Sequence, residues 1–363
     1  MTFDDVLTIK NGKNQKAVEN SNGKYPIYGS GGVMGYADAY ICDAETVIIG
    51  RKGSINNPIF VEEPFWNVDT AFGLVADKSV LNPRYLYYFC RNFDFEKLNK
   101  TVTIPSLTKS DLLKIEIKLP DLEQQRDIVK RLYSIEQIIQ KRETELKELD
   151  VLIKARFVEL FGDPEFNSMG WESEQLGNVC KVGSSKRIYQ NEQSPEGIPF
   201  LRISDLVNRM DTGEMTCDLY IPESRFEELL GQELVPIAGD ILLTARGTLG
   251  RCYIVKPEDR FYFQDGMISW LYDFSDSVTA LYISYLFDMP GFRKQIDGMQ
   301  AGSTVAYLSI SMTKKLVVML PPIKLQEQFA DFVEQVDKSK VAVQKALDEE
   351  QLLFDSLMQK YFG

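Results

Sequence analysis

Two short loops carry residue types that suit contact with nucleic acid. Arg51-Lys52-Gly53-Ser54 follows an apolar run typical of a buried strand, and Arg246-Gly247-Thr248 follows a second run of this kind. Arginine offers a planar fork of donors that matches a phosphate or the major-groove edge of guanine. The Ser or Thr hydroxyl and the glycine N–H can hold a neighbouring phosphate. Either loop alone could equally be a solvated turn. Their recurrence at equivalent places favours a binding role, which gives as candidate DNA contacts Arg51, Lys52, Ser54, Arg246 and Thr248.

Other turns offer weaker candidates of the same chemistry. Tyr28-Gly29-Ser30-Gly31-Gly32 could cradle a phosphate, but no Gly-Lys-Ser/Thr follows and no helix begins there. A hairpin turn is therefore the better interpretation. Asn11-Gly12-Lys13 fails as a nucleotide loop for the same reason. The further candidate DNA contacts are Lys13, Tyr28, Ser30, Lys186, Arg187 and Arg202.

Catalytic chemistry has little support in the sequence. There is no histidine, which removes the commonest general base and most catalytic zinc sites. Asp163-Pro164-Glu165-Phe166 is similar to the D/N-P-P-F/Y tetrapeptide of amino-methyltransferases, but it lacks the second proline, and no glycine-rich cofactor loop lies upstream. A Gly-Asp-Pro turn that ends a helix is the simpler interpretation. We therefore predict no catalytic, cofactor-binding or metal-binding residue in this chain.

Composition indicates a cytoplasmic protein of more than one domain. A chain of 363 residues is longer than one core usually serves. The five cysteines form no C-x-x-C pair, as expected of reduced thiols in the cytosol. The N-terminus has no signal-peptide pattern, and no apolar run approaches membrane-spanning length. The net charge of -12, with most of the acidic excess between residues 164 and 321, does not by itself favour nucleic-acid binding.

One long stretch occurs twice and organises the rest of the chain. Residues 122–162 recur as residues 323–363 at a constant offset of 201 positions (323 − 122), and the phase of the apolar residues is kept. Their 4-3 spacing predicts two long helices, each of about 60 Å. Asp121 and Gln124 predict a capping box at the first helix, and Gly162 predicts its end. Charged residues at seam positions favour a fixed helix register, namely Arg142, Arg156, Lys340 and Glu350.

The segments that precede the two long helices have similar patterns. The predicted strands include residues 45–50, 113–119, 240–244 and 316–320, with helices near residues 83–93 and 281–287. The prediction is an α+β fold with a pseudo-two-fold internal repeat: two globular mixed α/β domains are joined by two long antiparallel helices that form a coiled coil. The domain boundaries are 1–118, 119–162, 163–320 and 321–363.

These features together resemble the specificity subunit of type I restriction–modification systems. The resemblance spans the whole chain and rests on paired motifs: Leu-Pro-Asp-Leu-Glu-Gln-Gln at 119–125 with Leu-Pro-Pro-Ile-Lys-Leu-Gln at 320–326, the Phe-Gly ends at 161–162 and 362–363, and the lead from Gly162-Asp163-Pro164 to Val179. The run Gly239 to Gly247 also looks like this family's recognition domains.

The resemblance implies a division of labour. Each globular module would be a target-recognition domain that reads one half of a bipartite double-stranded DNA site. The helices would set the spacing and dock two methyltransferase (M) subunits, which bind S-adenosylmethionine and methylate adenine. Motor–nuclease (R) subunits would join through the complex. Two alternatives stay open: a self-contained adenine DNA methyltransferase, and a coiled-coil interaction protein that does not bind DNA.

Overall fold

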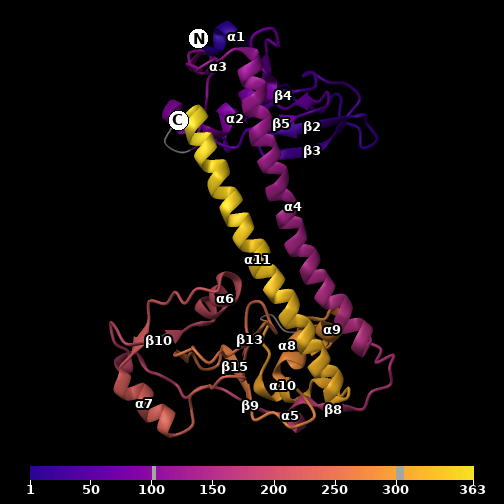
Figure 1. Cartoon of the computed structure of the whole chain (residues 1–363), viewed down its shortest axis with the longest axis vertical. Coiled ribbons are helices and arrows are strands. Elements are labelled where there is room, and N and C mark those ends of the chain that lie inside the picture. The colour runs from indigo at the N-terminus through magenta and orange to yellow at the C-terminus, as the bar shows by residue number, and fades with distance from the viewer. Residues whose placement is uncertain (100–103, 300–305) are drawn as a thin grey trace. The chain divides into compact units, whose positions relative to one another are not determined.

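The computed structural model describes residues 1–99, 104–299 and 306–363, and these fall into two compact units. The first unit comprises Met1–Glu145 and Val343–Gly363, and the second comprises Leu146–Ala342. Both units contain part of each long helix, α4 (Leu122–Phe161) and α11 (Ile323–Phe362), which Figure 1 draws as continuous ribbons. The prediction of two mixed α/β domains and two long helices is confirmed. The four-segment boundaries stay a prediction.

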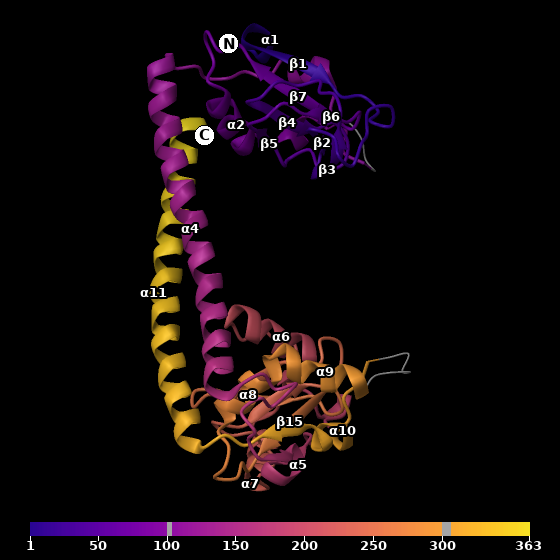
Figure 2. The same cartoon turned by 90° about the vertical axis from the view of Figure 1, so that its right-hand side faces the viewer.

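A four-stranded antiparallel sheet forms the centre of the first domain. Its order is β1 (Leu7–Asn11), β7 (Ala71–Ala76), β4 (Thr46–Gly50) and β5 (Ile59–Val61), and Figure 2 shows these strands as neighbours. Every residue of β4 is buried, because alternate side chains face opposite sides of the sheet and both sides are covered. Val47 and Ile49 pack with residues of α2 (Pro83–Asn92), while Ile48 belongs to a separate cluster around Cys42 and Phe65.

A second, three-stranded sheet carries the predicted hairpin. Strand β2 (Tyr25–Gly29) pairs antiparallel with β3 (Gly32–Ala37) and parallel with β6 (Trp66–Asn67). Gly32 has φ +122°, a conformation that side-chain-bearing residues rarely adopt. The first domain is completed by short helices: α1 (Phe3–Val6), the 3-10 turn η1 (Phe95–Leu98) and α3 (Lys109–Leu112).

The second domain repeats this topology with insertions. Its larger sheet has the order β9 (Lys181–Gly183), β15 (Ile268–Tyr272), β12 (Ile241–Thr244), β13 (Cys252–Ile254), and its smaller sheet has the order β11 (Tyr220–Ile221), β10 (Ile198–Leu201), β14 (Tyr262–Phe263). Helices α6 (Ile203–Thr212) and α7 (Glu223–Gly231) are inserted before β11 and before β12, and they account for much of the greater length of this domain. The other short helices are α5 (Leu176–Val179), η2 (Gln190–Glu192), α8 (Ala280–Asp288), α9 (Pro290–Met299) and α10 (Ile310–Lys315).

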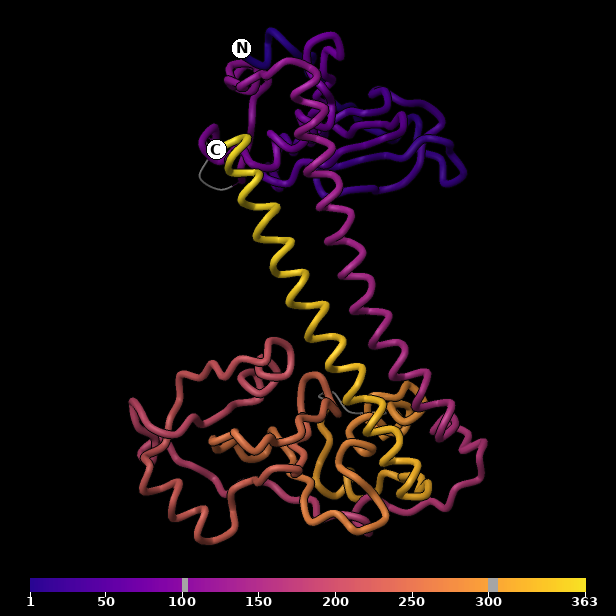
Figure 3. Tube along the Cα trace, in the orientation of Figure 1, coloured from indigo at the N-terminus to yellow at the C-terminus, as the bar shows by residue number. Residues whose placement is uncertain are grey.

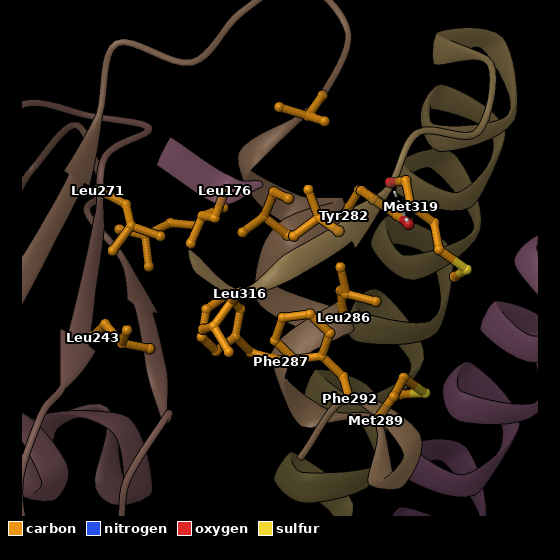
Figure 4. Close-up of a cluster of buried hydrophobic side chains, with 14 of the residues drawn as sticks. Leu176, Leu243, Leu271, Tyr282, Leu286, Phe287, Met289, Phe292, Leu316 and Met319 are labelled. Carbon is orange, nitrogen blue, oxygen red and sulfur yellow. Dashed lines mark hydrogen bonds between the residues drawn. The ribbon is translucent and has the colours of Figure 1, made fainter. Parts of the chain in front are cut away.

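The core of the second domain lies between its larger sheet and α8. Figure 4 shows Leu243 and Leu271 of the sheet on one side of the cluster and Leu286 and Phe287 of α8 on the other. The Tyr282 hydroxyl donates a hydrogen bond of 3.1 Å to the Met319 carbonyl, so the polar end of this buried ring is satisfied. Helix α8 is thereby fixed to the segment that enters α11.

The two long helices run antiparallel within each unit. In the second unit Asp150 pairs with Lys340 at 2.6 Å, while Phe157, further along α4, contacts Phe329 at a ring distance of 5.5 Å. In the first unit Arg142 lies 3.9 Å from Glu350, so two of the seam residues predicted to fix register face each other. The helices are drawn as traces in Figure 3. No helix of the described residues is long and apolar enough to cross a membrane.

The predicted N-cap and C-terminal end of the first long helix are observed. The Asp121 carboxylate accepts a hydrogen bond of 2.8 Å from the Gln124 N–H, as an N-cap should. Helix α4 ends at Phe161, and Gly162 has φ +78°. The Asp163 carbonyl and carboxylate then accept hydrogen bonds from Asn167 N–H and Glu165 N–H. Asp163-Pro164 is therefore a turn that follows the helix, as expected.

One predicted strand, at residues 113–119, is wrong. These residues leave α3 through a turn, and Glu116 forms only an isolated bridge with Thr2. The equivalent residues Val317–Met319 form β16, which pairs with β8 (Ser173–Gln175). The two segments differ in the strand available for pairing. Residues 115–117 lie beside Met1–Phe3 alone, and this short segment does not form a strand that could pair with them.

Candidate nucleic-acid interface

The Arg51–Ser54 loop is fixed to the protein on both sides. It leaves the fully buried strand β4, and the Arg51 N–H donates 2.7 Å to the Thr70 carbonyl. The Arg51 carbonyl accepts 3.0 Å from the Leu107 N–H, and Lys52 forms a bridge with Ser106. Gly53 has φ +81°, which turns the chain outward. The result is a firmly held backbone from which the Arg51, Lys52 and Ser54 side chains extend into solvent.

The turn at residues 67–70 gathers the other candidates of the first domain. The Lys13 N–H donates 2.8 Å to the Asn67 carbonyl, and the Tyr28 carbonyl accepts 3.0 Å from the Val68 N–H. Ser30 and Ser54 both lie close to Gly50, at the end of β4. A Cβ atom placed on Gly50 would be 3.0 Å from the Ser30 Cβ and 2.2 Å from the Ser54 carbonyl oxygen. The structure thus places five candidates close to the turn at residues 67–70 or to the Arg51–Ser54 loop: Lys13, Ser30, Arg51, Lys52 and Ser54. Tyr28 and Ser30 are both half-buried, and burial raises the pKa of the Tyr28 hydroxyl.

The Arg246 loop of the second domain has the same frame. The Ala245 N–H donates 2.9 Å to the Met267 carbonyl, and the Ala245 carbonyl accepts 2.9 Å from the Leu308 N–H. Arg246 forms a bridge with Tyr307, and the next residue, Gly247, has φ +67°. Arg246 and Thr248 are both exposed. The hydrogen-bond register makes Arg246 the counterpart of Lys52, and Ala245 the counterpart of Arg51.

Lys186 and Arg187 lie on the loop after β9 and are tied to the same region. The Arg187 guanidinium pairs with the Asp265 carboxylate at 2.8 Å, which raises the pKa of Arg187. The Lys186 N–H donates 2.8 Å to the Tyr262 hydroxyl. Asp265 belongs to the turn at residues 264–267, which also receives the Ala245 N–H. Exposed Lys186 and Arg187 therefore border the turn that holds the Arg246 loop.

Arg202 is placed differently from the other candidates. Its backbone N–H and its Nε both donate to Asp205, at 2.9 and 3.0 Å, and its guanidinium also pairs with Asp218 at 2.5 Å. The hydrogen bonds to Asp205 raise the pKa of Arg202. These contacts fix the start of α6, so the side chain has a structural task that the sequence pattern did not reveal.

Sequence reasoning missed the residues on the facing segments. Asp69 and Thr70 are exposed on the first domain's turn, and Ser106 and Tyr307 lie opposite the two glycine loops. The constant offset between the repeats could have pointed to Ser106 and Tyr307. The residues that follow them, Leu107 and Leu308, are also 201 positions apart (308 − 107).

A hollow of about 390 Å³ lies beside Thr248 and is polar because of its arginines. It is lined by Arg251 and Arg293 among others, but Arg251 pairs with Asp211 at 2.6 Å and Arg293 donates 3.0 Å to the Leu249 carbonyl. The arginines that line the hollow are thus engaged by Asp211 and by the backbone that follows Thr248.

A buried glutamine joins each domain to its long helix. Gln125 of α4 accepts 2.8 Å from the Asn82 N–H, and its amide donates 2.9 Å to the Val80 carbonyl and 2.8 Å to the Pro120 carbonyl. Asn82 in turn caps α2, accepting from the backbone N–H groups of Arg84 and Tyr85. The joint thus ties the start of α2 to the start of α4.

The second unit contains the same joint. Gln326 of α11 accepts 2.8 Å from the Thr279 N–H and donates 2.8 Å to the Ser277 carbonyl and 2.9 Å to the Pro321 carbonyl. Both glutamines have no exposed surface. Each candidate loop therefore belongs to a domain that is hydrogen-bonded to one long helix.

The cysteines are poorly suited to nucleophilic chemistry. All five are free thiols, and burial raises the pKa of Cys42 to about 11 and that of Cys180 to about 12. A thiol with so high a pKa stays protonated at neutral pH and is a weak nucleophile.

The arrangement of donors on the two loops suits recognition of an anionic, hydrogen-bonding surface.

Comparison with known proteins relates the chain to one family. Residues 1–149 and 169–351 match the family model described as the type I restriction modification DNA specificity domain. A type I restriction enzyme specificity subunit from Haemophilus influenzae is 27% identical over 347 residues, covering 92% of this chain and 86% of that protein. The MjaIX specificity subunit from Methanocaldococcus jannaschii is 23% identical, with coverage of 86% and 74%.

Solved structures share the fold over the whole chain. The S subunit of a type I restriction-modification system from M. genitalium gives a TM-score of 0.62 at 18% identity, covering 100% of this chain and 95% of that one. A chain from a structure concerned with complex assembly and conformational transition of the type I R-M system gives 0.59 at 16% identity, with coverage of 100% and 96%.

Proposed function

We propose, because the chain belongs to the family of type I restriction modification DNA specificity domains, that it is the non-catalytic DNA-recognition subunit of a type I restriction–modification complex. Each domain reads one half of a bipartite DNA site through its glycine loop and the neighbouring turn. The observation that carries this proposal is the loop frame itself, which occurs in both domains with the same hydrogen bonds and exposed cations.

The long helices set the separation of the two half-sites and dock two methyltransferase subunits. Helix surfaces away from the seam have apolar residues that a partner could cover: Val151 and Leu152 on α4, and Val341, Leu352 and Leu353 on α11 are all exposed. Exposed apolar residues on a helix are typical of surfaces that bind another protein. This separates the seam, which joins the two helices, from the faces offered to partners.

The chemistry belongs to the partners. The methyltransferase subunits bind S-adenosylmethionine and methylate adenine, and motor–nuclease subunits join through the assembled complex. A structural neighbour comes from a structure of type I R-M complex assembly, which supports partners of this kind. The complex works in the cytoplasm, where DNA is accessible and the free cysteines stay reduced.

The test is to map methylated adenines in genomic DNA exposed to the chain reconstituted with its methyltransferase subunits, and to footprint the complex on the motif found. We expect a bipartite motif with a fixed gap. No footprint on any genomic DNA would favour an interaction protein that does not bind DNA. Methylation by the purified chain alone would instead establish a self-contained methyltransferase.

The acidic net charge of the chain predicts that the isolated subunit binds DNA weakly. Nonspecific DNA affinity comes largely from neutralising phosphates, and a net charge of -12 opposes it. The isolated chain is therefore expected to bind DNA at least roughly ten-fold more weakly than the complex, because bound methyltransferase subunits supply much of the clamp. Fluorescence anisotropy at one fixed salt concentration measures both affinities. Equal, tight binding by the two would refute this expectation.

A further inference from the structure

We infer that Lys52 and Arg246 are structurally equivalent specificity-determining residues, and that Tyr307 makes the Arg246 contact the more discriminating of the two. The inference rests on the proposed function and deepens it by naming the chemistry of each half-site contact. Arg246 selects a guanine, whereas Lys52 makes a contact that tolerates more than one base.

The equivalence follows from backbone hydrogen bonds. The residue before each cation is held on both sides: Arg51 by Thr70 and Leu107, and Ala245 by Met267 and Leu308, all at 2.7 to 3.0 Å. Each cation then bridges the facing segment, Lys52 to Ser106 and Arg246 to Tyr307. Each is followed by a glycine with positive φ. The two cations therefore leave their domains from the same place.

The side chains at that place differ in what they can read. The Arg246 guanidinium lies over the Tyr307 ring, 5.0 Å from its centre, and this cation–π contact restricts its rotation. A planar fork held in this way presents parallel N–H groups, which match O6 and N7 of guanine. Lys52 is opposite Ser106, which has no ring, and an ammonium group is a mobile point charge without a fork.

Arg51 is an addition of the first domain rather than the counterpart of Arg246. Its guanidinium lies 5.7 Å from the Phe72 ring of its own sheet, and the matching position in the second domain is Ala245. A charge at this position is therefore not part of the shared frame. It suits a phosphate contact that strengthens binding of the first domain to any sequence.

The experiment compares conservative variants in the reconstituted complex, using a library of sites with each base pair randomised in turn. Arg246→Lys is expected to reduce discrimination at one G·C pair of one half-site by roughly ten-fold and to leave the other half-site unchanged. Tyr307→Ala should reduce discrimination at the same pair, and Tyr307→Phe should preserve it, because the ring is retained. Lys52→Arg should change preference only in the other half-site.

Arg260→Lys is the matched control. Arg260 is also an exposed arginine of the second domain and also lies over a ring, 5.3 Å from the centre of Phe226, but it pairs with Glu223 and Glu227. It is expected to alter no base preference. Thermal melting of each variant shows whether the second domain remains folded.

Two results would be distinct failures. If Arg246→Lys weakens binding to all sequences equally, Arg246 is a phosphate contact, and the inference falls while the proposed function stands. If the unmodified complex gives no bipartite footprint, the proposed function itself fails.

Discussion

Replacing Gln125 with leucine is expected to destabilise the first unit by about 1–3 kcal/mol, because it leaves partly buried backbone groups without partners. Leucine fills a similar volume, so the loss is one of hydrogen bonds rather than of packing. The Asn82 N–H and the Val80 and Pro120 carbonyls would all lose the contacts that Gln125 now makes. An unmade hydrogen bond of a buried group costs about 1–3 kcal/mol.

Thermal unfolding followed by circular dichroism, together with hydrogen exchange at Asn82, measures this effect. Gln124→Leu is a matched control, because Gln124 is the preceding residue of the same helix and its side chain is exposed. Gln326→Leu should reproduce the loss in the second unit, with faster exchange at Thr279. If Gln124→Leu and Gln125→Leu lower stability equally, the glutamine joint is not what holds α2 to α4.

The sequence predicts the helical part of this fold well, because helix periodicity is a local property. The 4-3 spacing located α4 and α11, Asp121 located the N-cap and Gly162 located the end. The order of the sheets follows less directly, because strand pairing depends on distant partners. Residues 113–119 and 316–320 have similar patterns. Only the second segment contains a strand, β16, because β8 is there to pair with it.

The sequence predicts where the two candidate loops lie along the chain, but not which of their residues occupy equivalent positions. The recurrence of a basic residue, a glycine and a hydroxyl after a strand located both loops. The pairing of Lys52 with Arg246, rather than Arg51 with Arg246, depends on which backbone groups bond to residues 70, 107, 267 and 308. Arg202 shows the limit of residue type as a guide, because its donors are engaged by Asp205 and Asp218 inside the domain.

The glutamine joint could be predicted only in part from the sequence. The repeat aligns Gln125 with Gln326, so its recurrence was visible in the sequence. A polar residue in the first turn of a helix is usually exposed, and sequence alone gives no reason to bury it. Only the structure shows that its partners are the backbone groups at the start of α2 and α8. The recurrence reflects the joint between domain and helix rather than a DNA contact.

Removing one heptad from both long helices is expected to shorten the gap between the half-sites. Suitable deletions are residues 143–149 and 343–349, which lie between the Arg142–Glu350 and Asp150–Lys340 contacts. Seven residues of helix span about 10 Å, which corresponds to roughly three base pairs of duplex. A deletion of seven residues keeps the 4-3 seam in phase, so both flanking contacts can reform.

Mapping methylated adenines with the shortened chain in the reconstituted complex measures the gap directly. Deleting residues 143–149 alone is the informative control: it places helices of unequal length side by side, so it should lower the melting temperature and abolish a fixed gap. The double deletion should instead stay folded, because every remaining apolar seam residue keeps a partner at the same heptad position. A folded double-deletion chain that methylates the original motif with an unchanged gap would reject the helices as the spacer. The distance would then have to be set by the recognition domains or by the methyltransferase subunits.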